Sequence, residues 1–349
     1  MILKTWIVLA LAVVLGLPGV VASNALAAEA EQAAGYGTFD RDAGVFPDSS
    51  GMKRPYIVHF KSRFDGAADY FTISFPKNFD PQKAYPLWLK FCPFYGSRSA
   101  LKRPTLAWNY CDDNNAIIIG CNERSVGESF LGDNQQLRDP AFLKEKKHEG
   151  LIPENIPKDV LELMNEMCHL FKINYIGATG ASMGGYSSLR LMTYLPREHV
   201  GVVVSSCPAL YFRPWAKDGS DRITEAVKRG HFNDAFVKIL QGTADDTVPI
   251  QVARDLTALV PDKQGWELVE VKGAGHRDFF CCSSQPKYPY DEDWGKSDVV
   301  PDLWGQIHAW EKANPQRMES RLPPLAGWKP GASWYLPKAI VDAAFPAQR

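Results

Sequence analysis

The stretch GATGASMGGY, residues 177–186, separates an apolar run typical of a β-strand from an apolar run typical of an α-helix. It places Ser182 in the pattern Gly-x-Ser-x-Gly, between Gly180 and Gly184. Small neighbours would let the backbone turn sharply and hold the serine hydroxyl out at the tip, where the start of the following helix favours developing negative charge. Glycines also occur in purely structural strand-to-helix turns, so this stretch must be weighed with the rest of the chain.

Short apolar runs and amphipathic segments alternate on both sides of this turn. The runs predict strands at 56–60, 69–75, 85–91, 115–120, 174–180, 201–206, 235–242 and 266–273. The amphipathic segments predict helices at 155–171, 184–195, 220–230 and 252–260. Residues 35–51 are expected to form a loop. The alternation predicts an α/β fold with a mostly parallel central sheet flanked by helices on both sides.

The helix expected at 155–171 has a clear apolar face. Asn155 is a candidate cap, and Pro157 falls in the first turn. The positions expected to be buried are Val160, Leu163, Met164, Met167 and Phe171.

Two further polar groups follow predicted strands. Asp245 lies in GTADDTVP after the strand at 235–242, and His276 lies in GAGHRDF after the strand at 266–273. Ligands and chemistry gather at the carboxyl ends of the strands of such a sheet. The order Ser, Asp, His along the chain is the one that the Gly-x-Ser-x-Gly turn requires.

With these three elements in register, the chain resembles the α/β-hydrolase superfamily, in its secreted-esterase and prolyl-oligopeptidase-like branch. The resemblance covers about residues 55–313. It implies a Ser-His-Asp triad in which Ser182 is the nucleophile, His276 the base and Asp245 the acid, with the adjacent Asp246 as the alternative acid. A serine hydroxyl needs a base near neutral pH, and a carboxylate fixes the tautomer of that base.

The oxyanion hole of such an enzyme needs two backbone donors, and the resemblance assigns the first to Met183. The family usually draws the second from just beyond a His-Gly pair, but this chain has Cys92-Pro93 at that place. Proline has no N–H, so the second donor would be Phe94, or alternatively Tyr95.

Aromatic residues near the expected strand ends are candidates for substrate binding. Tyr95 would act from the segment after residue 91, whereas Tyr211 and Trp215 would act from the loop after residue 206. Ordinary core packing is an equally good interpretation of each.

The composition of the 349-residue chain limits its partners. The net charge is −1, without long runs of one sign, so neither nucleic acid nor an anionic membrane is expected as a partner. There is no Cys-x-x-Cys pair and no His pair at metal-ligand spacing, so neither a metal nor a cofactor is expected. The expected substrate is a small-molecule or polysaccharide-linked ester; the sequence does not define the oligomeric state.

The N-terminus has the pattern of a signal peptide. Lys4 precedes an apolar stretch, and small residues surround Ala27, which predicts cleavage there and a secreted or periplasmic protein. The expected organisation is a signal peptide at 1–27, an N-terminal extension at 28–54, the catalytic domain at 55–313 and a C-terminal extension packed on that domain at 314–349.

The function predicted from these features is that of a secreted serine hydrolase that cleaves carboxylic esters through an acyl-enzyme. Too few residues precede the first matched strand to form the propeller of the oligopeptidases, so a serine peptidase without a propeller is the second interpretation. A catalytically silent binding protein on the same fold is the third, because of the departure at Cys92-Pro93.

Overall fold

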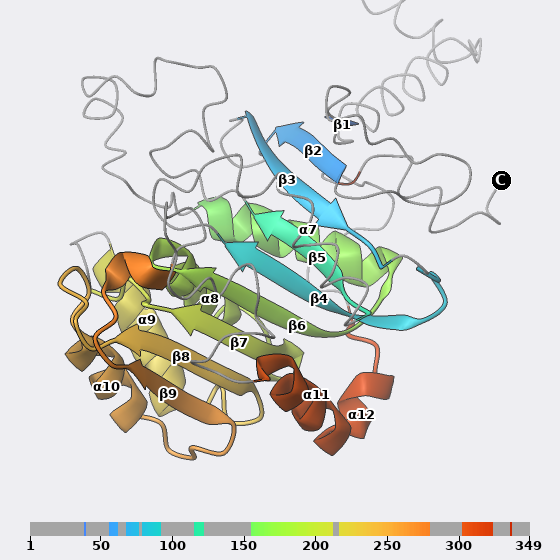
Figure 1. Cartoon of the computed structure of the whole chain (residues 1–349). Coiled ribbons are helices and arrows are strands. Elements are labelled where there is room, and N and C mark those ends of the chain that lie inside the picture. Colours follow the sequence, from blue (N-terminus) through green and yellow to red (C-terminus); the bar gives the residue numbers. More distant parts are fainter. Residues whose placement is uncertain are drawn as a thin grey trace, which may run out of the picture.

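The computed structural model describes residues 38–39, 56–61, 68–76, 79–91, 115–121, 155–211, 216–279, 302–323 and 336. Within these residues a nine-stranded sheet has the strand order β1-β2-β3-β5-β4-β6-β7-β8-β9. Helices cover both faces of the sheet (Figure 1). The predicted α/β class and the α/β-hydrolase fold are confirmed.

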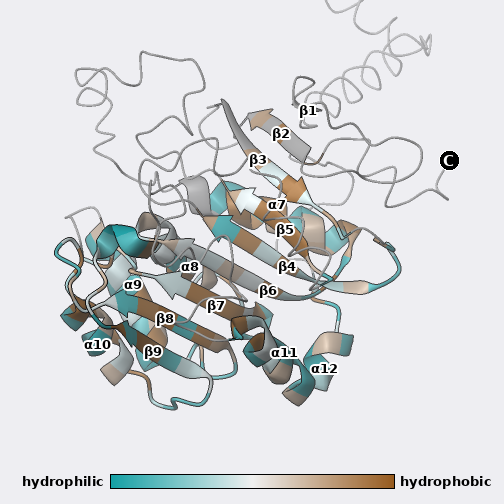
Figure 2. Ribbon diagram, in the orientation of Figure 1, coloured by the Kyte–Doolittle hydropathy of each residue, from teal (hydrophilic) through white to brown (hydrophobic). Residues whose placement is uncertain are grey.

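Strands β2 to β9 follow the predicted runs closely, whereas β1 was not predicted. They are β1 (Thr38–Phe39), β2 (Tyr56–Lys61), β3 (Ala68–Ser74), β4 (Ala84–Phe91), β5 (Ile117–Cys121), β6 (Lys172–Ala181), β7 (Val200–Ser206), β8 (Phe236–Gly242) and β9 (Trp266–Val271). Strands β5, β4, β6, β7, β8 and β9 pair in parallel, whereas β1, β2 and β3 pair antiparallel. Strands β7 and β8 are buried along their whole length, as expected of strands covered on both faces, and their ribbons are largely hydrophobic (Figure 2).

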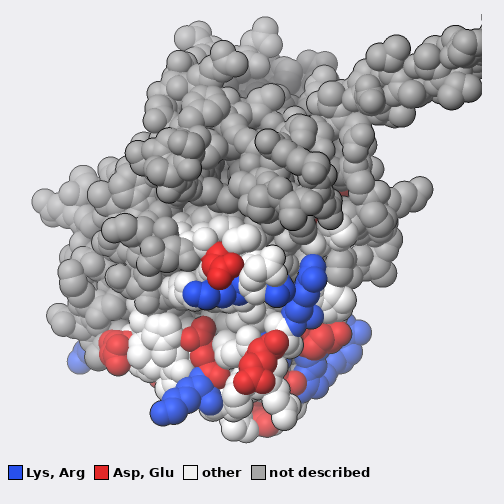
Figure 3. Space-filling model, turned by 90° about the vertical axis from the view of Figure 1, so that its right-hand side faces the viewer, with Lys and Arg blue, Asp and Glu red and all other residues white. Residues whose placement is uncertain are grey.

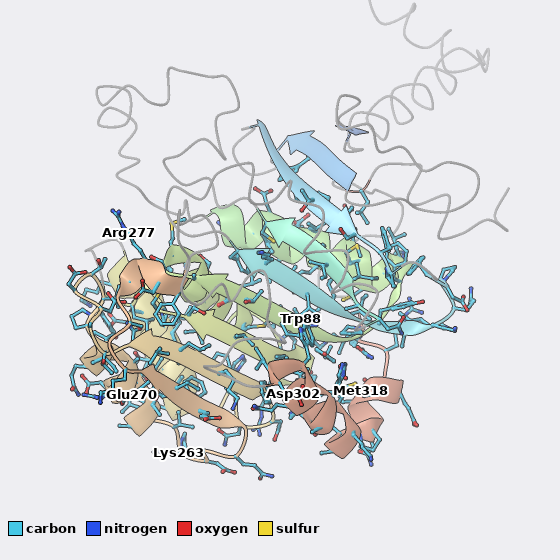
Figure 4. The ribbon with its side chains drawn as sticks, viewed as in Figure 1. Trp88, Lys263, Glu270, Arg277, Asp302 and Met318 are labelled. Atoms are coloured by element: carbon cyan, nitrogen blue, oxygen red, sulfur yellow. The ribbon has the colours of Figure 1, made fainter. Side chains whose placement is uncertain are left out.

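Helices connect and cover the strands. They are α7 (Asn155–Leu170), α8 (Met183–Met192), the 3-10 helix η3 (Arg197–His199), α9 (Lys217–Lys228), α10 (Ile250–Ala258), the 3-10 helix η5 (His276–Phe279), α11 (Leu303–Ala313) and α12 (Pro315–Glu319). The apolar side chains of α7, α8, α9 and α10 form one cluster with one face of the sheet. Those of η5 and α11 form a second cluster with the other face, where Trp88 of β4 packs edge-on against Trp304 with ring centroids 5.5 Å apart (Figure 4).

The apolar face predicted for the first of these helices is confirmed. All five expected positions are buried in the cluster that α7 shares with the sheet: Val160, Leu163, Met164, Met167 and Phe171. The expected cap is wrong by one position, because Asn155 is already the first residue of α7. The sequence pattern predicts the presence of a helix more reliably than its first residue.

Two parts of the fold were not anticipated. Thr38 and Phe39, within the loop expected at 35–51, form the short strand β1 along β2. Helices α11 and α12 extend the fold beyond the last predicted strand, and the chain after them returns to β6, where the amide of Leu322 donates to the carbonyl of Ile173 (2.7 Å). Further along the expected C-terminal extension, the amide of Leu336 donates to Glu166 Oε2 of α7 (3.2 Å).

The charges of the described surface are mixed. On the face shown in Figure 3, Lys and Arg side chains lie beside Asp and Glu side chains. Among the described residues, no helix has both the length and the apolar character required to cross a membrane. The signal peptide expected at residues 1–27 lies outside the described residues.

The strand order places a switch point beside the Ser182 turn. From β4 the chain moves to β5 on one side and then returns to β6 on the other side of β4. In sheets of this kind, ligands bind where the strand order reverses, outside the carboxyl ends of the strands. At that end Phe91, the last residue of β4, is paired with Gly180 of β6, directly before the Ser182 turn.

Candidate active site

Ser182 lies between β6 and α8 in a strained backbone conformation, with φ 57° and ψ −115°. Three backbone hydrogen bonds hold it there. Its amide donates to the carbonyl of Ser206 (2.9 Å), and its carbonyl accepts from the amides of Tyr186 (2.9 Å) and Ala209 (3.0 Å). A non-glycine residue in such a region costs on the order of 1–3 kcal/mol, and it persists where the surroundings over-determine it. The turn is therefore built to hold this serine in one orientation.

Gly180 is required by close packing. A Cβ at this position would lie 2.5 Å from the carbonyl carbon of Gly184 and 2.8 Å from the carbonyl oxygen of Phe91. Both neighbours are backbone atoms, which cannot rotate away as a side chain could. The first glycine of the motif thus lets the turn close against its own helix and against the end of β4.

The structure brings His276 and Asp245 to this serine. The Oγ of Ser182 lies 2.9 Å from His276 Nε2, and His276 Nδ1 lies 2.8 Å from Asp245 Oδ2. The three residues are buried, with exposed fractions of 7%, 8% and 8% for Ser182, Asp245 and His276. Ser182, His276 and Asp245, which the sequence singles out, therefore form one continuous hydrogen-bonded chain. Arg277, next in sequence to His276, is exposed at the same edge of the sheet (Figure 4).

The loops that carry the acid and the histidine are packed together. The amide of Ala244 donates to the carbonyl of Ala274 (3.0 Å). A Cβ on Gly242 would lie 2.1 Å from that same carbonyl oxygen. This close approach of β8 and β9 at their carboxyl ends fixes the separation between Asp245 and His276.

The geometry distinguishes the two adjacent aspartates. Asp245 is buried and accepts from backbone amides as well as from His276, whereas Asp246 is exposed and accepts from the hydroxyl of Thr247 (3.3 Å). The amides of Thr247 (2.9 Å) and Val248 (2.8 Å) donate to Asp245 Oδ1. Asp245 is thus the carboxylate that reaches the histidine.

The residues expected to form the oxyanion hole are described only in part. Met183 is the first residue of α8, so its amide is among those that an α-helix leaves without an intrahelical partner. This amide follows Ser182 directly. Phe94 and Tyr95 lie outside the described residues, although the strand that leads to them ends beside Gly180.

Of the two substrate-binding candidates in the loop after β7, Trp215 lies outside the described residues and Tyr211 lies within them. Tyr211 has φ 53° and an exposed fraction of 45%. Its amide donates to Ser220 Oγ (3.0 Å), and its hydroxyl donates to Asp221 Oδ1 (3.0 Å) on α9. The exposed ring is therefore fixed in position on a segment that begins against the Ser182 turn.

Cys207 is a neighbour of this site that sequence reasoning missed. It follows β7 with φ 37°, is fully buried, and donates its S–H to the carbonyl of His276 (3.7 Å). Cys207 is not part of a recognisable sequence motif. Only the position of β7 between β6, which precedes Ser182, and β8, which precedes Asp245, could have indicated it.

Cys207, Asp245 and His276 also form a group of potential metal ligands, with ligand atoms within 4.8 Å of one another. The carboxylate of Asp245 already accepts four hydrogen bonds within the protein, two at each oxygen, including one from Gln241. A carboxylate has about four lone-pair sites. The group is therefore arranged for hydrogen bonding to His276 rather than for holding an ion.

Comparisons with known proteins find similar structures only at low sequence identity. No protein-family model matches the chain, and no curated protein matches it at a significant level. A thermostable esterase is 16% identical with a TM-score of 0.43, over 77% of this chain and 63% of the esterase chain. A CE1 ferulic acid esterase from Anaeromyces mucronatus is 16% identical with a TM-score of 0.43, over 68% of this chain and 90% of that chain.

A puromycin-hydrolyzing peptidase from Mycobacterium tuberculosis is also similar, with 12% identity and a TM-score of 0.46. The match covers 66% of this chain and 38% of the peptidase, so this chain spans well under half of its length. The assignment of the fold rests on the strand order, the parallel pairing and the Ser182 turn of this chain. Together these features define an α/β-hydrolase architecture.

Proposed function

We propose that this protein is a serine hydrolase that cleaves carboxylic esters through an acyl-enzyme intermediate. The observation that supports this most strongly is the continuous chain of hydrogen bonds from Ser182 Oγ through both ring nitrogens of His276 to Asp245 Oδ2, at 2.9 and 2.8 Å. A nucleophile, a base and an orienting carboxylate in this geometry are the parts that acyl transfer requires.

In the proposed reaction, Ser182 Oγ attacks the carbonyl carbon of the ester while its proton passes to His276 Nε2. Asp245 accepts a hydrogen bond from His276 Nδ1–H, which selects the tautomer whose Nε2 can take the proton and stabilises the imidazolium that forms. Collapse of the tetrahedral intermediate breaks the bond to the alcohol oxygen, which takes the proton from Nε2. A water molecule then attacks the acyl-enzyme by the same steps and releases the acid.

The developing oxyanion needs two donors. Met183 N–H fits one of them, since it is the first amide of α8 and directly follows the nucleophile. We assign the second to Phe94 N–H, with Tyr95 as the alternative, because β4 ends at Phe91 beside Gly180 and Pro93 cannot donate.

We propose Tyr211 as a contact of the substrate. Its segment begins at Cys207 and Ala209, which contact the carbonyls of His276 and Ser182, and its exposed ring is held by α9. Tyr95 and Trp215 are proposed as further contacts. The proposed substrate is a small-molecule or polysaccharide-linked ester, with no metal or cofactor taking part.

A panel of p-nitrophenyl esters and aminoacyl-p-nitroanilides tests this function with the purified protein. We expect turnover of esters, and we expect Ser182→Ala to lower kcat by roughly 10⁴-fold or more because triad members act as a unit. Turnover restricted to the anilides would decide for a peptidase. A folded protein that cleaves neither class would decide for a silent binding protein.

We further propose that the protein is exported. Lys4, the apolar stretch after it and the small residues around Ala27 support this. N-terminal sequencing of the protein recovered from its native compartment should begin directly after the cleavage site near Ala27. Recovery of a chain that still carries residues 1–27 would contradict it.

A further inference from the structure

Gln241 lies within reach of the proposed triad but is not part of it. It is the next-to-last residue of β8, four positions before Asp245, and it is fully buried. Its Nε2 donates to Asp245 Oδ2 (2.8 Å) and to the carbonyl of Val248 (2.9 Å). Both hydrogens of the side-chain amide are thus used on the turn that carries the acid.

The oxygen contacted by Gln241 is the same one that faces the histidine. Asp245 Oδ2 accepts from Gln241 Nε2 and from His276 Nδ1, each at 2.8 Å. The other oxygen is occupied by the amides of Thr247 and Val248. Rotation of the carboxylate would break bonds at both oxygens, so the donor set fixes which lone pair points at the imidazole.

The orientation of the Gln241 amide follows from its surroundings. Both of its partners, a carboxylate oxygen and a carbonyl oxygen, accept hydrogen bonds and cannot donate them. A flipped amide would place Oε1 against these acceptors. Within the described residues, Oε1 in the unflipped arrangement accepts no hydrogen bond.

From this arrangement we propose that Gln241 is a positioning residue: it holds Asp245 Oδ2 as the acceptor for His276 Nδ1–H and so keeps Nε2 available to the Ser182 proton. The proposal rests on the proposed function for its catalytic consequence. The local geometry that it describes can be measured without turnover. The described titratable groups gathered at this position are Asp245, His276 and Cys207.

Three variants test the proposal in the full chain. Gln241→Leu removes the donor, and Gln241→Glu keeps the shape but makes the donor titratable. Gln251→Glu is the matched control, because Gln251 donates to Asp255 Oδ1 (2.7 Å) four residues further on, at an exposed position of α10. The control also replaces a glutamine that donates to an aspartate four residues further on by glutamate, but it lies away from the proposed triad.

The kinetic readouts are kcat and KM on an ester, from pH 5 to 9. We expect Gln241→Leu to lower kcat by roughly 10- to 100-fold with little change in KM, because the Asp245 carboxylate loses one of the two hydrogen bonds at Oδ2. For Gln241→Glu, the neutral acid can donate to Asp245 and the ionised acid cannot. The ratio of its kcat to that of the wild type should therefore fall as pH rises, and the ratio for Gln251→Glu should stay flat.

The structural readout is the far-downfield NMR signal of the His276 Nδ1 proton, assigned by its loss in His276→Gln. We expect Gln241→Leu to shift or broaden this signal and Gln251→Glu to leave it unchanged. If Gln241→Leu fails to fold, the isosteric Gln241→Glu carries the same comparison, followed by NMR from low to high pH.

The outcomes separate the two proposals. An active wild type with unchanged kcat and signal in the folded Gln241 variants, or a flat ratio for Gln241→Glu, would overturn the role of Gln241 alone. An inactive wild type whose signal nevertheless moves in the Gln241 variants would overturn the proposed function and leave the positioning role standing.

Discussion

The turn that carries Ser182 and the turn that carries Asp245 are stabilised in different ways. At Ser182 the main chain fixes the conformation, through three backbone hydrogen bonds and through Gly180, where the surrounding backbone leaves no room for a Cβ. At Asp245 the side chain is fixed, by two backbone amides and by the side chains of Gln241 and His276. A turn that is fixed by close backbone packing requires glycine, so it is visible as a motif in the sequence. A turn that is fixed by hydrogen-bond donors can use many residue types and shows no motif.

The largest expected effect tests the acid turn. Asp245→Asn should lower kcat by about 10⁴-fold, because the amide imposes the wrong tautomer on His276, as the same change does in serine proteases. Asp246→Asn, one residue along on an exposed side chain, should change kcat by no more than a few-fold. Steady-state kinetics on one ester compare the two. The reverse ranking would show that the acid is Asp246.

The next effect tests the steric turn. Gly180→Ala should lower the free energy of unfolding by about 1–3 kcal/mol or more, because its Cβ would meet backbone atoms 2.5 and 2.8 Å away. Gly275→Ala, beside His276, is the control: its Cβ would have no neighbour closer than 3.8 Å. Urea unfolding measures both. Equal losses in the two variants would mean that close packing does not set the Ser182 turn.

The smallest effect concerns His231, whose side chain lies 2.9 Å from a backbone carbonyl oxygen, whereas His276 contacts a carboxylate. Burial, and secondarily the nearby arginines Arg229, Arg197 and Arg222, lower the pKa of His231, while its hydrogen bond to the carbonyl of Met192 acts the other way. The folded state then binds fewer protons than the unfolded state. Stability from this group is therefore complete above the unfolded pKa of about 6.5 and declines as pH falls below it.

His231→Gln removes this titration and retains a side-chain N–H for the Met192 carbonyl. Urea unfolding from pH 8 to pH 5 should give a shallower loss of stability for the variant than for the wild type. A second buried histidine, His199, has a pKa lowered mainly by burial and should contribute part of the slope in both proteins. An unchanged slope in His231→Gln would contradict the role assigned to His231.

The contrast between the two turns also explains what the sequence could predict. Ser182 and His276 were found because glycines flank them at strand ends, and Asp245 was separated from Asp246 only by the resemblance to a family pattern. Gln241 and Cys207 were missed because neither belongs to a motif; their roles depend on which strands lie side by side. Strand β1 and helices α11 and α12 depend on packing against distant parts of the chain, which local periodicity does not reveal.

The central claim is that Ser182 is a nucleophile activated by His276, and covalent labelling tests it most directly. A fluorophosphonate reacts when the serine oxygen attacks phosphorus and fluoride leaves, so it reports the activated serine whatever the preferred ester. Peptide mass mapping of the labelled wild type should find one phosphonyl group, on Ser182, and none on Ser182→Ala. Labelling of a different serine, or none on the folded wild type, would contradict the account.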